Sequence, residues 1–348
     1  MTRHEVAVVG TGGIADAHAR AWQAQPDCDL LACADVVPER AREYAAEQGI
    51  DPARAYESFE EMLREVEPDV VSVCTPENTH EAIVTGIART GVPDAIHCEK
   101  TMADTWGGAQ RLAGECDRRG IQLTINHQRR FGEPWRDVKA LLDEGAIGDL
   151  RRMEYSFADL FTYGTHQIDT FGLWNDDRPA EWVLGQIDYR TENTFRGTHV
   201  ENQVFAMWEY DNGVHGMAST GMGRGFVGSY SRLRGTDGEI ELRKHFEDDA
   251  PSYSLAVRRA DETDWNVTDY PETGSWERAF ASVIDALDAG DEPALGAENA
   301  LRTTEILFAV YESSRRRGRI DLPLETDDNP LNAMVESGEL TPGPEGGE

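Results

Sequence analysis

The sequence predicts an α/β protein with two domains. The N-terminal domain is expected to have a doubly wound parallel sheet, and the C-terminal α/β domain a large, mostly antiparallel open sheet. Over the first ~125 residues, short apolar runs alternate strictly with helix-like segments, which is typical of parallel sheets. A glycine-rich turn follows the first apolar run. After about residue 148, longer alternating segments with hairpin-type turns indicate antiparallel strands.

The apolar runs of the first domain are short and rich in β-branched residues, as in strands buried on both faces. Helix-like segments follow each run, and one begins with a proline at its first turn. We expect strands at residues 6–9, 30–35, 70–74, 95–98 and 121–125, and helices at residues 14–25, 38–48, 58–65, 78–90 and 104–119.

The second part of the chain reads differently. Asp211-Asn212-Gly213 and Thr236-Asp237-Gly238 have the composition of hairpin turns. We expect strands at residues 150–157, 181–189, 200–210, 214–220, 229–233 and 239–242, and helices at residues 163–174, 276–289 and 297–317. The last two helices could pack on either domain. The predicted domains are residues 1–126 and 127–328, and residues 329–348 are expected to form a disordered acidic tail.

The composition excludes several functions. The chain has 33 basic and 65 acidic residues in 348, a net charge of −32. This charge argues against binding nucleic acid or anionic membranes. Abundant acid with only three lysines suggests a halophilic protein, because salt screens charge repulsion. No apolar run approaches the ~20 residues of a membrane helix. We expect no signal peptide, a cytoplasmic protein, and five reduced core cysteines.

The glycine-rich turn predicts a dinucleotide site. Gly10 permits a tight turn directly after the first strand, and Gly12 lets the backbone approach a pyrophosphate. Ala15 is small enough for close packing of helix on strand. The helix that begins near Gly13 and Ile14 would direct its N–H groups at the phosphates. The same turn without any ligand is the alternative structural interpretation.

An acid at the end of the second strand favours NAD. Asp35 lies 23 residues after Gly12, where a carboxylate can accept hydrogen bonds from ribose hydroxyls. The same carboxylate would repel the 2′-phosphate of NADP. Arg40 leaves NADP binding open. Residues 1–126 are therefore interpreted as an NAD(P)-binding domain.

Lys100 is the most informative residue at the other strand ends. The only lysines are Lys100, Lys139 and Lys244, so a lysine directly after a predicted buried strand is conspicuous. Ligands of doubly wound sheets bind beyond the carboxyl ends of the strands. Lys100 is therefore predicted to act beside a nicotinamide, and a structural ion pair with Glu99 is the alternative.

Several motifs occur together in a fixed order. They are the Gly10–Ala15 turn, Thr75-Pro76-Glu77-Asn78-Thr79-His80, Glu99-Lys100, Asn126-His127-Gln128-Arg129-Arg130-Phe131, Gly164-Thr165-His166-Gln167-Ile168-Asp169 and Gly235-Thr236-Asp237-Gly238. In these motifs the chain resembles the glucose–fructose oxidoreductase, inositol dehydrogenase and MocA (Gfo/Idh/MocA) family. The resemblance covers about residues 5–323.

The resemblance implies a Rossmann domain, a substrate and oligomerisation domain, and homodimers or homotetramers. It also implies NAD(P)-dependent oxidation or reduction of a sugar or cyclitol. Lys100 corresponds to the lysine that polarises the reacting hydroxyl, and His166 to the general acid/base. Thr75, Pro76, Asn78, His80 and Glu99 correspond to positions that line the cofactor. Gln128 and Arg129 correspond to substrate-facing positions, and Thr162, Tyr163 and Asp169 are further candidate substrate contacts.

Two positions depart from the family pattern. Many members have an aspartate four residues before the histidine, where this chain has Thr162. A threonine cannot carry the charge that tunes the lysine and histidine, and Asp159 or Asp169 are candidates to replace it. Thr101 stands where many members have proline, so we expect a trans bond after Lys100.

Other interpretations remain. A redox-neutral enzyme that retains NAD, of the glycosidase or epimerase type, and a non-catalytic NAD-sensing protein are the alternatives to a dehydrogenase. No metal site is expected, because His166 and Asp169 have no further ligand cluster around them. His199 and Glu201 are expected on a solvated strand face rather than in a second site.

Overall fold

The computed structural model describes residues 3–245, 252–271 and 273–343. The chain forms two compact units. Unit 1 contains residues 1–128 and 276–301, and unit 2 contains residues 129–275 and 302–348. The first segment of unit 1 thus ends two residues beyond the expected boundary at residue 126, and unit 1 also includes residues 276–301, which are expected from the sequence in the second domain.

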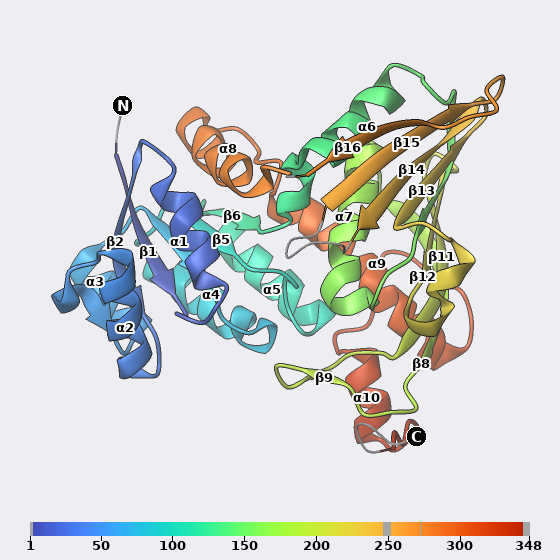
Figure 1. The fold of residues 1–348 in the computed structure, drawn as a ribbon. Coiled ribbons are helices and arrows are strands. Elements are labelled where there is room, and N and C mark those ends of the chain that lie inside the picture. The colour runs from blue at the N-terminus through green and yellow to red at the C-terminus, as the bar shows by residue number, and fades with distance from the viewer. Residues whose placement is uncertain (1–2, 246–251, 272, 344–348) are drawn as a thin grey trace. The chain divides into compact units, whose positions relative to one another are not determined.

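Unit 1 contains a six-stranded parallel sheet in the order β3-β2-β1-β4-β5-β6, with helices around it (Figure 1). This is the predicted doubly wound sheet. Its strands are β1 (His4–Val9), β2 (Cys28–Ala34), β3 (Ala55–Tyr56), β4 (Val70–Val73), β5 (Ala95–Cys98) and β6 (Gln122–Ile125). Its helices are α1 (Ala15–Gln23), α2 (Pro38–Gln48), α3 (Phe59–Val66), α4 (His80–Thr90) and α5 (Trp106–Asp117), with the short turns η1 (Pro52–Arg54) and η2 (Glu77–Thr79).

Local sequence explains where these elements begin and end. Every residue of β4 and β5 is buried, as expected for central strands covered on both faces. The Ser58 and Thr105 side chains cap α3 and α5 by accepting from backbone N–H groups. The helix α8 (Ser275–Ala289) brings Phe280 within 4.6 Å of Trp22, centroid to centroid. The C-terminal segment therefore completes the core of unit 1.

Unit 2 is built on a nine-stranded sheet in the order β16-β15-β14-β13-β7-β12-β11-β8-β17, in which only β7 and β12 pair in parallel. This confirms the predicted mostly antiparallel sheet. Its strands are β7 (Leu150–Tyr155), β8 (Ala180–Asp188), β11 (Gln203–Tyr210), β12 (His215–Ser219), β13 (Ser231–Gly235), β14 (Gly238–His245), β15 (Ser252–Arg259), β16 (Asn266–Tyr270) and β17 (Ile320–Asp321). A two-stranded sheet, β9 (Thr194–Phe195) and β10 (Thr198–His199), stands apart.

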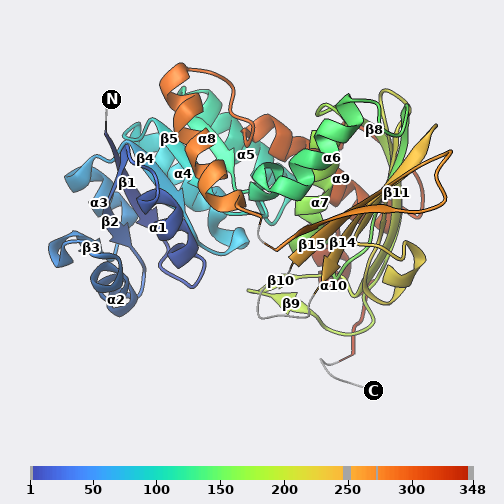
Figure 2. The same cartoon turned by 45° about the horizontal axis from the view of Figure 1, so that its top comes forward.

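The helices α6 (Glu133–Asp143), α7 (Thr165–Trp174) and α9 (Ala297–Arg316) lie on one face of this sheet (Figure 2). Met153, Leu233 and Ile240 point to the covered face and are fully buried. Short helical turns are η3 (Gln128–Phe131), η4 (Leu160–Gly164) and η5 (Gly221–Phe226).

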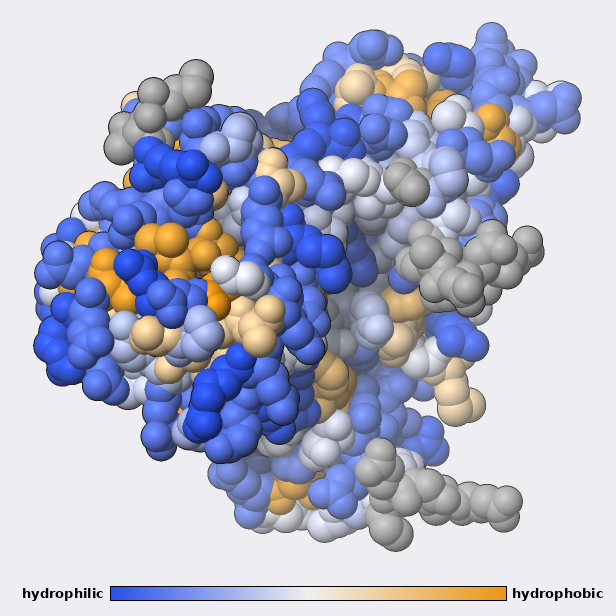
Figure 3. Space-filling model, turned by 60° about the vertical axis from the view of Figure 1, so that its left-hand side comes forward, coloured by the Kyte–Doolittle hydropathy of each residue, from blue (hydrophilic) through white to orange (hydrophobic). Residues whose placement is uncertain are grey.

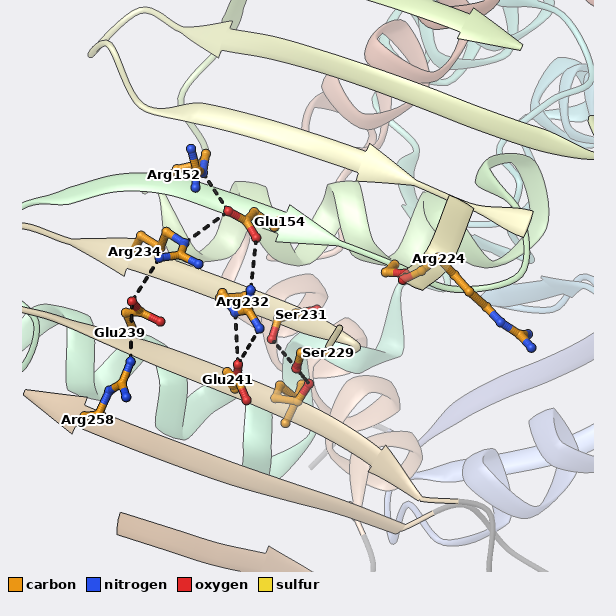
Figure 4. Close-up of polar contacts among 12 residues, drawn as sticks. Arg152, Glu154, Arg224, Ser229, Ser231, Arg232, Arg234, Glu239, Glu241 and Arg258 are labelled. Atoms are coloured by element: carbon orange, nitrogen blue, oxygen red, sulfur yellow. Dashed lines mark hydrogen bonds and ion pairs between the residues drawn. The ribbon is translucent and has the colours of Figure 1, made fainter. Parts of the chain in front are cut away.

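The opposite face of the sheet carries a network of arginines and glutamates. Alternation along a strand places Glu154, Arg232 and Glu241 on that face. Figure 4 shows Glu154 between Arg152 of the same strand, β7, and Arg232 and Arg234 of the neighbouring strand β13. Arg232 Nη2 lies 2.7 Å from Glu241 Oε1 across the β13–β14 pair. These pairs place opposite charges side by side on adjacent strands across this face, which is the face without the helices α6, α7 and α9.

The expectation of a disordered tail is wrong for the part that the structure describes. The helix α10 (Pro330–Glu336) begins at Asn329, whose side chain accepts from the backbone N–H of Leu331 and Asn332. Leu331 and Met334 are buried. The side-chain cap and the buried apolar face stabilise this helix, although the segment around it is rich in acidic residues and glycine.

The surface fits the composition. The face shown in Figure 3 is mostly hydrophilic, with smaller apolar patches. All five cysteines are buried and unpaired, which confirms their interpretation as core residues. Within the described residues, no helix combines the length and apolar character needed to cross a bilayer.

Candidate active site

The glycine turn of unit 1 is shaped for close approach. Gly10 has φ +87°, and a Cβ there would lie 2.6 Å from Thr75 Cγ2, so only glycine fits. A Cβ at Gly12 or Gly13 would meet no atom within 4 Å. The turn is therefore tight at Gly10 and open at the two glycines that precede Ile14 and α1. This open space fits the pyrophosphate of a dinucleotide at a helix N-terminus.

Asp35 follows β2 and is anchored by the turn itself. One of its oxygens accepts from the backbone N–H and hydroxyl of Thr11, at 2.9 and 3.1 Å. The other oxygen accepts from the N–H of Val37 at 2.9 Å. A carboxylate has about four lone-pair sites, and these contacts use three of them, so the oxygen that accepts from Val37 can still accept from a ribose hydroxyl. Arg40 lies in the first turn of α2 and is exposed.

The segment after β4 contains Thr75, Pro76 and Asn78. Thr75 and Pro76 are partly exposed, and Asn78 is exposed on the turn η2. His80 is completely buried at the start of α4. Its Nε2 lies 2.9 Å from the carbonyl oxygen of Thr75, and its Nδ1 lies 3.0 Å from that of Thr101. The imidazole ring thus connects the end of β4 to the segment that follows Lys100.

Glu99 is part of a buried polar network. Its Oε1 lies 2.9 Å from His18 Nε2 and accepts from Asn126 Nδ2 at 2.6 Å. His18 Nδ1 lies 2.7 Å from the Ser72 hydroxyl. Burial alone would raise the pKa of Glu99, but His18 outweighs it and lowers the pKa to about 2. Glu99 therefore supports the strand end from inside the unit, and no local sequence pattern predicts its contact with His18.

Lys100 directly follows this network and is partly exposed at the end of β5. Its backbone N–H donates to Glu99 Oε2 at 3.3 Å. The Lys100–Thr101 peptide bond is cis. The expectation of a trans bond, which depended on the absence of proline, is wrong.

His166 lies in the first turn of α7 in unit 2 and is 5% exposed. The π-helical turn η4 precedes it and contains Thr162 and Tyr163. Asp159 caps this turn: one oxygen accepts from the N–H groups of Thr162 and Tyr163, at 2.6 and 3.0 Å. Both oxygens lie 2.8 Å from the Thr162 hydroxyl. A carboxylate is therefore present beside the position where the family pattern has one.

Asp169 is engaged elsewhere. Its two oxygens accept from Arg130 Nε at 2.9 and 2.8 Å, and Arg130 also contacts Asp177. Asp169 and Arg130 are both buried, so their ion pair fixes α7 to η3. Gln128 and Arg129 lie in η3 beside Arg130. Among the described residues, no group of three or more histidines, cysteines or acids could hold a metal.

Glu201 corrects another expectation. It is 1% exposed, not on a solvated strand face. It accepts from the backbone N–H of Leu160 at 2.5 Å and from the Tyr311 hydroxyl. Burial and the nearby Asp159 raise the pKa of Glu201 to about 8. The Glu201 side chain therefore supports the turn η4 from inside the unit. Its role depends on contact with Tyr311, which is distant in the sequence, so no local pattern predicts it.

Comparison with known proteins agrees with this architecture. Residues 4–127 match the NAD-binding Rossmann fold of the oxidoreductase family GFO_IDH_MocA, and residues 151–322 match its C-terminal alpha/beta domain. D-apiose dehydrogenase of Paraburkholderia graminis is 24% identical over 97% of this chain and 95% of its own. Inositol 2-dehydrogenase of Rhizobium meliloti is 28% identical over 90% and 98%.

A solved structure has the same fold. An oxidoreductase from Agrobacterium radiobacter, in complex with NAD+, L-tartaric acid and magnesium, superposes with a TM-score of 0.76. It is 21% identical and covers 92% of this chain and 98% of its own. The two family domains together span most of the sequence, in the order that the motifs predict. The chain belongs to the Gfo/Idh/MocA family of oxidoreductases.

Proposed function

We propose that this protein is an NAD-dependent dehydrogenase that acts on a hydroxyl or carbonyl group of a sugar or cyclitol. The glycine turn carries this proposal. Gly12 and Gly13 leave open space at the N-terminus of α1, and Asp35 presents a carboxylate at the end of β2. Relatives named D-apiose dehydrogenase and inositol 2-dehydrogenase support the substrate class.

NAD is preferred over NADP in this proposal. The Asp35 carboxylate is held by Thr11 and Val37 and would repel a 2′-phosphate. The two residues after Asp35 are valines, which offer no positive charge to a phosphate. Arg40 is the nearest cation in the sequence, on the exposed first turn of α2.

Bound NAD supplies the hydride acceptor. In the proposed oxidation, the Lys100 ammonium donates a hydrogen bond to the reacting hydroxyl oxygen and lowers the pKa of that hydroxyl. His166 accepts the hydroxyl proton, since imidazole titrates near neutral pH. Asp159 and Thr162 position the turn that precedes His166. Glu99 and His18 hold the strand end that carries Lys100.

We also propose that the protein acts in the cytoplasm as a homodimer or homotetramer. The five free, buried cysteines suit a reducing compartment. The open face of the nine-stranded sheet suits contacts between subunits, since Leu184 and Phe205 are exposed on it among the charged pairs.

The test is an initial-rate assay of nicotinamide reduction with NAD and with NADP, across aldoses, uronates and cyclitols, in molar KCl. The proposal predicts a clear rate with one sugar class and a preference for NAD. If folded protein binds NAD but reduces none with any compound, the dehydrogenase assignment is wrong. NAD that stays bound through purification would then indicate the redox-neutral class.

A further inference from the structure

The helix that carries His166 begins with a π-helical turn. The turn η4 ends at Gly164 and α7 begins at the next residue, and Gly164 itself has helical φ and ψ angles of −67° and −29°. Residues 160–174 therefore form one continuous helix, with His166 directly after the π-helical turn. Such turns are rare and frequently occur at functional sites. Because the helix is continuous, a displacement of η4 would also move His166.

Two acidic side chains hold the beginning of this helix. Asp159 accepts from the backbone N–H groups of Thr162 and Tyr163, at 2.6 and 3.0 Å. Glu201 Oε1 accepts from the backbone N–H of Leu160 at 2.5 Å. The N–H groups of a first helical turn have no acceptor within the helix itself. Asp159 and Glu201 supply these acceptors from outside it.

Glu201 comes from a segment that is itself fixed to the sheet. It lies two residues before β11 and is 1% exposed. The next residue, Asn202, donates from its backbone N–H to the carbonyl oxygen of Asp188 at the end of β8, at 2.9 Å. The Asn202 side-chain oxygen accepts from the N–H of Thr191 at 3.0 Å. The acceptor for Leu160 is therefore anchored to β8 and not to the turn that it supports.

The other oxygen of the Glu201 carboxyl group accepts from the hydroxyl of Tyr311 on α9. Tyr311 is completely buried. This part of α9 is fixed to β8 as well, because the Ser313 hydroxyl accepts from the backbone N–H of Gly185 at 2.8 Å. Tyr311 therefore orients the Glu201 carboxyl group, and this group in turn holds the beginning of the helix that carries His166.

The Glu201 carboxyl group is uncharged at neutral pH. The titratable groups that act on it are Asp159 before η4, Tyr311 on α9 and Tyr155 on β7. Burial and the charge of Asp159 raise the pKa of Glu201 to about 8, so at pH 7 it holds a proton. A protonated carboxyl group can still accept from the N–H of Leu160 through one oxygen and share a hydrogen bond with Tyr311 through the other. Glutamine, which is uncharged and has the same shape, can form the same two contacts.

We propose that Glu201 and Tyr311 are positioning residues, which act through the turn η4 to hold His166 in place for proton transfer. The catalytic part of this role rests on the proposed function, whereas the support of η4 does not. Proton transfer depends strongly on geometry, since a displacement of about 1 Å can lower a rate about 100-fold. Neither residue lies in the motifs that carry the family resemblance, so those motifs alone do not reveal this role.

Two measurements on the full chain saturated with NAD test the proposal. Hydrogen exchange of residues 159–166, followed by mass spectrometry, reports on η4, and steady-state turnover per bound NAD reports on catalysis. Glu201→Leu removes both contacts and should speed this exchange by about 10-fold or more. It should also lower kcat by about 10-fold or more, with a smaller change in KM and with NAD affinity within about twofold of the wild type. Tyr311→Phe should have smaller effects in the same direction.

A conservative variant and two controls separate positioning from a general loss of stability. Glu201→Gln should restore most of the protection and turnover that Glu201→Leu loses. Glu305→Leu is the glutamate control, because Glu305 on α9 accepts from the backbone N–H of Leu324 at 2.8 Å. Tyr189→Phe is the tyrosine control, because this buried hydroxyl donates to the carbonyl oxygen of Asn193 at 3.0 Å. Both controls should leave the exchange of η4 and kcat unchanged.

Wild-type kcat in Glu201→Leu would overturn the positioning role and leave the dehydrogenase proposal intact. Unchanged exchange of η4 in Glu201→Leu would overturn the support of the turn. Equal losses in Glu201→Leu and Glu201→Gln would also contradict the proposal, because glutamine keeps the two contacts. If the wild type itself reduces no nicotinamide, the dehydrogenase proposal is wrong and the positioning role is wrong with it, even where Glu201→Leu speeds the exchange.

Discussion

His18 Nε2 and Glu99 Oε1 lie 2.9 Å apart in the interior of unit 1. His18 is on α1, the helix that follows the glycine turn, and Glu99 immediately precedes Lys100. Their contact therefore links the proposed phosphate site to the strand end that bears the proposed catalytic lysine. Burial alone would lower the pKa of His18, but Cys74 and Glu99 raise it to about 10. Both partners are buried and favour their charged forms.

The His18–Glu99 pair predicts a pH dependence of stability. The pKa of His18 is raised by folding, so its contribution is complete below about 6.5 and is lost as pH rises toward its folded pKa. The pKa of Glu99 is lowered by folding, so the contribution of Glu99 to stability is complete above about pH 4.5 and is lost as pH falls toward 2. Urea denaturation of the wild type should give a free energy of unfolding that declines from pH 6.5 to pH 9.

Glu99→Gln should lower the free energy of unfolding at pH 6 by about 3 kcal/mol, because it leaves a buried imidazolium without its partner. The decline between pH 6.5 and pH 9 should become shallower. Exposed Glu47 on α2 provides the control, and Glu47→Gln should change stability by less than about 0.5 kcal/mol. An unchanged pH profile in Glu99→Gln would contradict the ion pair.

Two glycines of the turn predict opposite phenotypes. Gly10→Ala should destabilise the fold by about 2 kcal/mol or more, since its φ is +87° and the new Cβ would overlap Thr75. Gly12→Ala should keep the wild-type melting temperature, because its Cβ meets nothing, yet weaken NAD binding about 10-fold by filling the phosphate space. Calorimetric melting and fluorescence titration with NADH measure the two effects.

Gly225→Ala is the control for the Gly12 variant, since a Cβ there also lies in open space, in unit 2. It should change neither melting nor NAD affinity. Normal NAD affinity in Gly12→Ala would argue against the pyrophosphate site.

Asp35 predicts cofactor preference. Asp35→Ser removes the charge that would repel a 2′-phosphate and should shift the ratio of NADP to NAD affinity by about 10-fold or more toward NADP. Some loss of stability is expected as well, because the carboxylate anchors Thr11 and Val37. Binding should be compared with Asp29→Ser, which changes an exposed ion pair with Arg3 at the other end of β2. The same ratio in Asp35→Ser and wild type would exclude this role.

The charge of −32 predicts a dependence on salt. Between 0.1 and 1 M salt the screening length falls from about 10 Å to about 3 Å, which removes most repulsion between surface acids. The melting temperature should therefore rise in molar KCl, and by a similar amount in molar NaCl. A melting temperature that is unchanged or falls with KCl would contradict the interpretation as a halophilic protein.

Local patterns predicted much of the fold. The buried valine runs and the glycine turn predict β1 and β4, and the two hairpin turns predict the antiparallel pairs β11–β12 and β13–β14. Some elements have no such pattern. The side chains of β16 are exposed except at Tyr270, so the sequence of this edge strand shows no alternation of apolar and polar residues that would predict it. The amphipathic helix α6 went unpredicted, and α10 depends on the Asn329 cap within a segment that composition alone suggests is disordered.

The candidate site also contains residues that local patterns predict and contacts that they do not. The positions of the turn glycines, Asp35 and Lys100 follow from strand ends, which sequence can locate. His18 and Glu99 are 81 residues apart, and Arg129 and Tyr230 are 101 apart. Such contacts depend on packing between distant elements. The sequence likewise offers both Asp159 and Asp169 as replacements for the carboxylate missing at Thr162, and only the folded turn shows that Asp159 contacts the Thr162 hydroxyl.

The most direct test of the account is the steady-state turnover of Lys100→Ala with the best substrate of the initial-rate panel, at saturating NAD. Turnover should fall by about 10³-fold, the scale of acid–base and polarising contributions, with NAD affinity within about twofold of the wild type. Lys139→Ala should behave as the wild type in both measurements. Wild-type turnover in Lys100→Ala would show that this lysine takes no part in the chemistry and would contradict the proposed mechanism.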